Sequence, residues 1–248
     1  MTVKVFHENK SILMVWFLIQ WFEGVLAKMV ILPYQIGVIV ISSDPDRAYY
    51  GWWTEDREQM PVVRDTSKII PLFLSSWIFW HYVYSMIFAL VALAIERFFA
   101  TYFIEDYENV PRRYISYFLI LFTNFITIPY SFLIVKNLIP FWIAFAQCVI
   151  NGLFVFFGYL AFWRINVYLK RQLIRRSAQR VHKMGQYSLA RKFQIEENIR
   201  SFKLAIKMVI AAVIYLSISL VILICLMFDV FEEYESILVY IFDNIILA

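Results

Sequence analysis

Apolar residues in this chain are gathered into long blocks, and short polar stretches separate one block from the next. They do not recur with the spacing of an amphipathic helix or a half-buried strand. Blocks of about 20 residues match the length that a helix needs to cross roughly 30 Å of hydrocarbon. The final block is too short to cross as a helix. We predict transmembrane spans at about 11–41, 69–94, 114–135, 138–163 and 204–228, followed by a partial span at 237–248.

The composition is too apolar for a water-soluble domain. Of the 248 residues, 62% are hydrophobic and 19% aromatic, which is more than a soluble domain of this size can bury. The spans are expected to be helices, since a membrane strand barrel would show alternating segments of about ten residues. We therefore predict an all-α fold, a polytopic membrane helix bundle that forms one domain over residues 1–248.

Basic residues are distributed unevenly between the two sides of the predicted bundle. The loop 164–203, read as helical extensions of the fourth and fifth spans, holds eleven basic residues against two acidic ones. With the N-terminal tail and the 96–113 connection, that face carries sixteen basic residues, whereas the opposite face carries five. Because lysine and arginine are retained inside, we expect the N-terminus and loop 164–203 to be cytoplasmic. A glycan on Asn9, which begins the sequon Asn-Lys-Ser, would contradict this orientation.

Residues that could carry catalysis or bind a metal are scattered along the chain. The three histidines, His7, His81 and His182, lack the spacing of metal ligands. The sequence contains no glycine-rich phosphate-binding loop and no nucleophile elbow. We expect no enzymatic activity, no metal, no cofactor and no nucleic-acid partner, and a lipid bilayer as the environment.

Two opposite charges lie inside the first predicted span. A charge in the middle of the membrane costs roughly 2.5–3.5 kcal/mol on insertion scales. Glu23 and Lys28 are five residues apart, about 140° around a helix, so they cannot pair side to side. Each is expected to reach a neighbouring helix, unless Lys28 extends to the interface. For Glu23, a role in holding the bundle together and a role in function are equally well supported.

The second predicted span carries polar and aromatic residues at helical spacing: Trp77, His81, Tyr84, Ser85 and Phe88. The fifteen residues from His81 to Glu96 correspond to roughly 22 Å of helix. If Glu96 lies at the inner surface, His81 lies in the outer half of the membrane, at the depth of a ligand pocket. An interhelical hydrogen bond without any ligand explains a histidine at this depth equally well.

Several stretches resemble known membrane receptors. Glu96-Arg97-Phe98, at the inner end of the second span, resembles the acid–arginine–aromatic motif that ends the third helix of rhodopsin-like receptors. Longer stretches resemble the serpentine receptor class epsilon family of nematode chemoreceptors, over about 12–247 of the chain. They are WFEG…K…PYQIG (Trp21 to Gly37), WHYVYSMIF (Trp80 to Phe88), AIERFFATYFIEDYENVPRRYIS (Ala94 to Ser116) and RKFQIEENIRS (Arg191 to Ser201).

The resemblance implies a seven-helix chemosensory receptor that couples to a heterotrimeric G protein in the plasma membrane of sensory neurons. By motif, the first predicted span is similar to the family's second helix and the partial span to the start of its seventh. The chain is therefore expected to be a truncated member that lacks the first helix and the end of the seventh. Glu96, Arg97 and Phe98 would form the switch that couples to the G protein, with Arg97 paired to Glu96 or to an acid on the fifth span.

A small-molecule ligand is expected between the outer halves of the second, fourth and fifth spans. Depth and polarity favour four residues there: His81, Tyr84, Gln147 and Asn151. Two alternatives stay open. One is a channel or transporter in which Glu23, Lys28 and His81 line a permeation path, and the other is a truncated product without receptor function.

Overall fold

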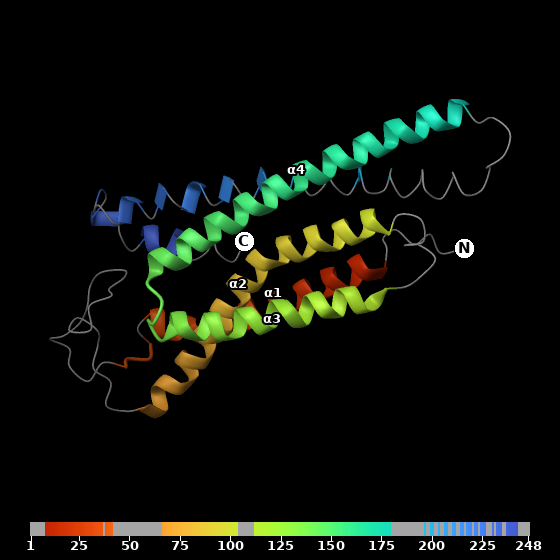
Figure 1. The fold of residues 1–248 in the computed structure, drawn as a ribbon. Helices are drawn as coiled ribbons and strands as arrows, with labels where there is room; N and C mark the ends of the chain where they lie inside the picture. The colour runs from red at the N-terminus through yellow and green to blue at the C-terminus, as the bar shows by residue number, and fades with distance from the viewer. Residues whose placement is uncertain are drawn as a thin grey trace. The chain divides into compact units, whose positions relative to one another are not determined.

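All the regular structure in the described part of the chain is helical. The computed structural model describes residues 8–36, 38–41, 66–103 and 112–179, together with separate positions between 196 and 242. The long helices are α1 (Glu8–Gln35), α2 (Thr66–Tyr102), α3 (Arg113–Val135) and α4 (Phe141–Gln179), and a short 3-10 helix follows at Glu232–Tyr234 (Figure 1). The predicted all-helical membrane fold is confirmed.

Four helices of the described chain are long and apolar enough to cross a bilayer. They lie at Ser11–Gln35, Ile69–Tyr102, Arg113–Val135 and Trp142–Gln172. α2 extends beyond its predicted span, because it continues past Ala94 to Tyr102. α4 continues past Trp163 to Gln179, which agrees with the helical extension predicted for the start of 164–203. The first helix is shorter than its predicted span and ends at Gln35. These extensions make Arg164 and the residues after it part of a helix.

The later part of the chain is described only in pieces. The described positions between 203 and 226 are helical and include an apolar helix at Ser217–Leu226, inside the fifth predicted span. Residues 237–242 of the predicted partial span are helical as well. Residues 42–65, 104–111, 180–195 and 243–248 lie outside the described residues, as does His7.

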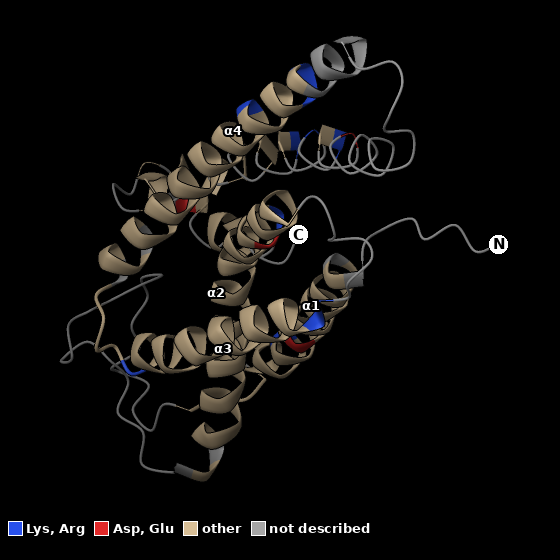
Figure 2. Ribbon diagram, turned by 45° about the vertical axis from the view of Figure 1, so that its right-hand side comes forward, with Lys and Arg blue, Asp and Glu red and all other residues tan. Residues whose placement is uncertain are grey.

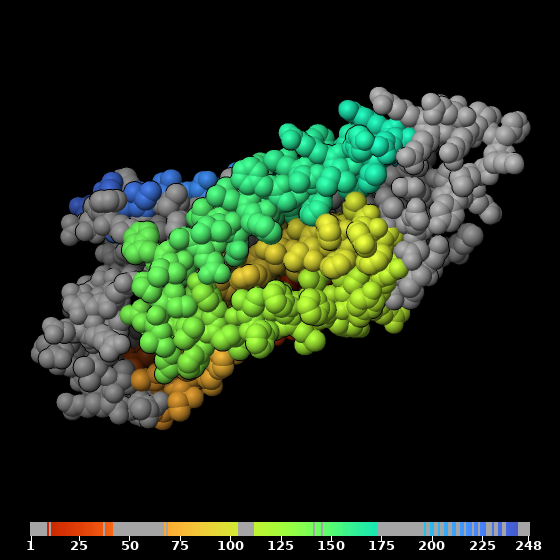
Figure 3. All heavy atoms as spheres, in the orientation of Figure 1, coloured from red at the N-terminus to blue at the C-terminus, as the bar shows by residue number. Residues whose placement is uncertain are grey.

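The outward surface of the helices is apolar. Side chains such as Leu121, Phe125 and Phe154 are 66–79% exposed, and Figure 3 shows α3 and α4 uncovered along one face. Charged residues are sparse along the helices, whose ribbon is mostly tan in Figure 2. An exposed apolar surface of this extent is typical of helices that lipid covers.

Residue contacts divide the chain into two compact units. Unit 1 comprises Met1–Phe17, Ile87–Asn124 and Gln147–Ala212, and unit 2 comprises Leu18–Met86, Phe125–Ala146 and Val213–Ala248. In unit 1, Ala94 of α2 packs against Val155 and Tyr159 of α4.

The core of unit 2 joins α1 to α2 and α2 to α3. Ala27 and Ile31 of α1 pack against Phe79 of α2. An aromatic cluster of Phe73, Trp77 and Phe132 then joins α2 to α3, with ring centroids 5.4–6.0 Å apart. The ammonium group of Lys136 lies 4.6 Å from the centroid of the Phe73 ring.

One glycine sets the closest approach between α1 and α2. A Cβ atom built on Gly24 would lie 2.6 Å from two ring carbons of Tyr82, and Tyr82 is only 5% exposed. Small residues allow membrane helices to approach closely, and close approach supplies much of their packing energy. Gly24 therefore permits this contact because it has no side chain.

Substituting Gly24 by alanine should destabilise the protein by about 1–3 kcal/mol, because a buried aromatic ring would have to move. Thermal unfolding of the detergent-solubilised chain measures the effect. Gly152→Ala on α4 is the matched control, since a Cβ there would meet nothing within 4 Å. Equal unfolding temperatures for the two variants would contradict the close packing.

The turn after α3 ends that helix through a left-handed residue. Asn137 has a φ of 52°, and its N–H donates to the carbonyl of Ile134 at 2.8 Å. The N–H of Leu138 donates to the carbonyl of Leu133 at 2.9 Å. This pair of bonds is the Schellman motif, which satisfies the last carbonyls of a helix. Asparagine tolerates the left-handed conformation better than most residues with a side chain.

Asn137→Gly should keep or slightly raise stability, whereas Asn137→Val should lower it by about 1–2 kcal/mol, because a branched side chain clashes in the left-handed region. Unfolding of both variants in detergent tests this. A valine variant as stable as the glycine variant would show that the turn adopts another conformation.

Candidate functional site

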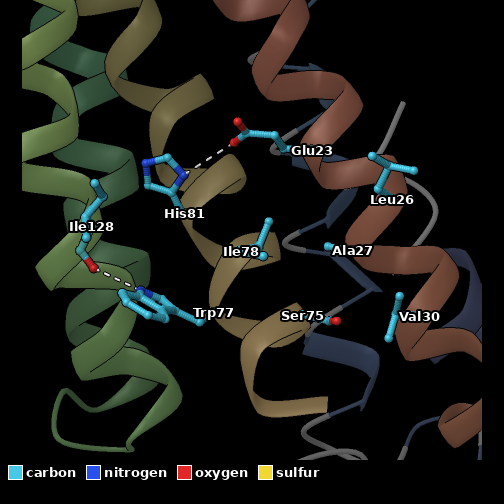
Figure 4. Close-up of a pocket in the computed structure, with 9 residues that line it drawn as sticks. All are labelled: Glu23, Leu26, Ala27, Val30, Ser75, Trp77, Ile78, His81 and Ile128. Carbon is cyan, nitrogen blue, oxygen red and sulfur yellow. Dashed lines mark hydrogen bonds and ion pairs between the residues drawn. The ribbon is translucent and has the colours of Figure 1, made fainter. Parts of the chain in front are cut away.

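Unit 2 contains a cavity of about 520 Å³ between α1, α2 and α3. Its volume is within the range of small-molecule pockets, which are mostly apolar with a few polar groups. The lining residues are Glu23, Leu26, Ala27, Val30, Ser75, Trp77, Ile78, His81 and Ile128 (Figure 4). No lysine or arginine is among these nine residues.

A carboxylate and an imidazole face each other at this cavity. The Oε2 atom of Glu23 lies 3.9 Å from Nδ1 of His81, and a dashed line marks the pair in Figure 4. This separation is beyond hydrogen-bonding distance. The Glu23 side chain is 40% exposed, whereas that of His81 is 12% exposed. The carboxylate thus has room to accept a further partner.

The other nitrogen of His81 continues a polar chain into α3. His81 Nε2 lies 3.4 Å from the hydroxyl of Ser85, and that hydroxyl lies 3.3 Å from the hydroxyl of Thr127. Ser85 and Thr127 are wholly buried. Polar groups buried among apolar helices are stabilised by pairing with one another. A line of polar side chains therefore runs from Glu23 on α1, through α2, to Thr127 on α3.

Trp77 forms a fixed wall beside this line. Its indole N–H donates to the backbone carbonyl of Ile128 at 3.1 Å, as Figure 4 shows. Its ring also packs edge-on against Phe132, with centroids 5.4 Å apart. The hydrogen bond and the ring contact together hold the orientation of the indole.

The other charge of the first span has a different environment. The ammonium group of Lys28 lies 5.7 Å from the centroid of the Phe79 ring on α2. Lys28 is not among the residues that line the cavity. Glu23 and Lys28 thus both contact α2, but they contact different parts of it.

Three residues expected at a ligand pocket do not line this cavity. Tyr84 is 2% exposed and packs between the rings of Trp80 and Tyr130. Gln147 and Asn151 belong to unit 1, where both are partly buried. The amide nitrogen of Asn151 is buried and has no hydrogen-bond partner in the described chain. A ligand role for these three residues stays a prediction.

Unit 1 contains a buried pair of charges at neighbouring positions. Arg97 Nε donates to Oε2 of Glu96 at 2.5 Å, and Arg97 Nη2 donates to Oε1 at 2.6 Å. Glu96 is wholly buried and Arg97 is 4% exposed. Two parallel charge-assisted bonds of this kind are strong and geometrically specific. Glu96, one of the two partners considered for Arg97 from the sequence, is observed in this pairing.

Hydrogen bonds tie the backbone beside this pair to α4. The hydroxyl of Thr101 donates to the carbonyl of Arg97 at 2.9 Å. The amide of Asn166, wholly buried on α4, donates to the Thr101 hydroxyl at 3.3 Å. The ring of Phe98 lies 5.7 Å from that of Phe162 on α4. The helix end that carries the charge pair is thus attached to a neighbouring helix.

Three of these polar residues were not expected at a site from the sequence: Thr101, Thr127 and Asn166. The sequence does contain a pattern that points to Thr127, because Thr123, Thr127 and Ser131 recur every four residues on a mostly apolar helix. All three are buried in the structure. Hydroxyls on one face of a membrane helix mark the side that meets another helix.

The environment of Asn9 bears on the glycosylation sequon. Asn9 lies inside α1 and is wholly buried, and its carbonyl accepts a hydrogen bond from the Ser116 hydroxyl at 3.0 Å. A glycan on its side chain would not fit in this packing.

The described residues include no group of three or more histidine, cysteine, aspartate or glutamate side chains that could hold a metal ion.

Glu96→Ala should destabilise the chain by about 3–5 kcal/mol, because it leaves the buried Arg97 without its main partner. Replacing both charges, as in Glu96→Leu with Arg97→Met, should recover most of that loss, since well-packed apolar residues can replace a buried pair. Unfolding of the purified variants in detergent measures both effects. A double variant as unstable as Glu96→Ala would contradict this account.

Comparisons with known proteins identify similar sequences along the whole chain. The family model described as Sre G protein-coupled chemoreceptor matches residues 1–248. Serpentine receptor class epsilon-37 of Caenorhabditis elegans is 41% identical over 244 residues, which cover 98% of this chain and 66% of that relative. Serpentine receptor class epsilon-38 of the same species is 37% identical over 245 residues, with the same coverage of each chain.

A more distant relative is serpentine receptor class epsilon-45 of Caenorhabditis elegans, 30% identical over 207 residues, 84% of this chain and 54% of the relative. The chain thus spans just under two thirds of the length of class epsilon-37 and of class epsilon-38. No solved structure matches the chain.

Proposed function

Because the chain belongs to the family of Sre G protein-coupled chemoreceptors, we propose that it is a multi-pass membrane receptor that binds a small molecule and signals to a heterotrimeric G protein. The match of the family model over the full 248 residues carries this proposal. Membership also argues against an enzyme. The plasma membrane of a sensory neuron is the proposed location.

The cavity beside Glu23 and His81 is the proposed ligand site. It has a suitable volume, an apolar wall and two titratable side chains, which together are typical of small-molecule sites. The polar side chains from His81 through Ser85 to Thr127 connect this site to α3. A ligand at Glu23 would change the packing of α2 on α3 through these side chains. Ligand binding would stabilise the arrangement of these helices that makes the better contacts.

The pair of Glu96 and Arg97 is the proposed switch. In the inactive arrangement, Arg97 is held by its neighbour and by the helix end that Asn166 attaches to α4. Release of Arg97 from Glu96 would free the guanidinium to interact elsewhere and let the helix ends rearrange. On the orientation predicted from the basic residues, this end of α2 faces the cytoplasm, where a G protein binds.

The competing channel hypothesis needs Glu23, Lys28 and His81 on one path. Lys28 lies over the Phe79 ring and does not line the cavity with the other two. The receptor function is therefore better supported than the channel.

Glu96→Gln should raise basal signalling about tenfold. The neutral amide would hold Arg97 more weakly than the carboxylate does, because a charge-assisted hydrogen bond would be lost. The measurement is guanine-nucleotide exchange on a G protein reconstituted with the chain in nanodiscs. Glu196→Gln is the matched control: Glu196 is 48% exposed and pairs with Lys170 at 3.4 Å. Exchange that is equal in Glu96→Gln, Glu196→Gln and unmodified protein, at equal folded amounts, would reject the switch.

A further inference from the structure

We propose that the cavity between α1, α2 and α3 binds a hydrophobic monoamine, with the ammonium group against Glu23 and the apolar body along the helix walls. This inference rests on the proposed ligand site and names the chemical class of its ligand. Three features of the lining residues carry it: the sign of the charge, the number of charges and the distribution of apolar surface.

The sign of the charge favours a cation. Among the described residues that line the cavity, Glu23 is the one acidic residue, and none is a lysine or an arginine. An anionic ligand would meet the Glu23 carboxylate in surroundings of low dielectric constant, where repulsion between like charges is strong. His81 offers at most one positive charge to offset it. A cation instead gains the attraction of the carboxylate.

Glu23 is positioned to accept such a group. Its side chain is 40% exposed, and the imidazole of His81, its one titratable partner in the described chain, is 3.9 Å away, too far for a hydrogen bond. The imidazole is held from its other side by Ser85 at 3.4 Å. An ammonium group near Glu23 would therefore add charge-assisted bonds without breaking a closed ion pair.

The rest of the lining limits the ligand to one charge. Apart from Glu23, Ser75 and His81, the lining side chains in the described chain are aliphatic or the indole of Trp77. A second ammonium would lie among these apolar side chains, without a second carboxylate. Leu26, Val30 and Ile78 instead favour an aliphatic or aromatic body. The two ends of the ligand thus have opposite requirements, which a monoamine satisfies.

A series of ligands with one apolar body tests the ammonium group directly. Octylamine, octan-1-ol, octanoic acid and octane-1,8-diamine are titrated onto the purified chain in phosphatidylcholine nanodiscs, and binding is measured from the change in tryptophan fluorescence. Octylamine should bind about 10- to 100-fold more tightly than each of the others, the range expected for a hydrogen bond to a charged group.

Glu23→Gln should remove this preference and leave octan-1-ol binding unchanged, whereas Glu196→Gln, outside the cavity, should keep it. Val30→Trp should weaken all four ligands by filling the cavity, while Met29→Trp, on the same helix and not in the lining, should not. The Glu23→Gln variant therefore tests whether the carboxylate charge binds the amine, and the Val30→Trp variant tests whether the ligand lies in the cavity.

Equal binding of octylamine and octan-1-ol, tighter binding of octanoic acid, or an amine preference that persists in Glu23→Gln would overturn the proposal. So would an absence of binding by all four. None of these outcomes touches the nucleotide-exchange test at Glu96, which needs no ligand and decides the receptor function separately.

Discussion

The structure depends on the scarcity of water around membrane-spanning helices, which favours polar side chains that pair with one another inside the protein. The described helices show two solutions. In unit 1, Glu96 and Arg97 neutralise each other at bonding distances of 2.5 and 2.6 Å. In unit 2, Glu23, His81, Ser85 and Thr127 form a line with longer separations. Both arrangements lie on the inward faces of helices whose outward faces are apolar.

The difference between the two solutions fits the two roles proposed for them. A closed, wholly buried ion pair resists change, because separating its members leaves two unpaired charges. The Glu23–His81 pair is open to a cavity and its separation leaves room for another group. In the proposed receptor function, the open pair would accept the ligand and the closed pair would define the resting state.

Glycine and asparagine allow the backbone geometry that supports these contacts. Gly24 lets α1 approach the ring of Tyr82, one residue along the chain from His81, and so brings Glu23 within reach of the imidazole. Asn137 ends α3 with a satisfied backbone in the turn before α4. Neither residue has any chemistry of its own in the proposed function. Each is needed for its conformation or its small size.

The sequence by itself determined the helical fold and the positions of the apolar spans, because the thickness of the bilayer fixes the length of a spanning helix. It also placed an acid beside a base at Glu96 and Arg97, because these two residues are neighbours in the chain. It did not determine that Glu23 meets His81, that Ser85 meets Thr127, or that Asn166 reaches Thr101. The sequence of a helix that is apolar on nearly all sides does not show which side faces the other helices and which faces lipid, since the lipid and the protein interior are equally apolar. Only the packed structure decides which polar side chains face one another.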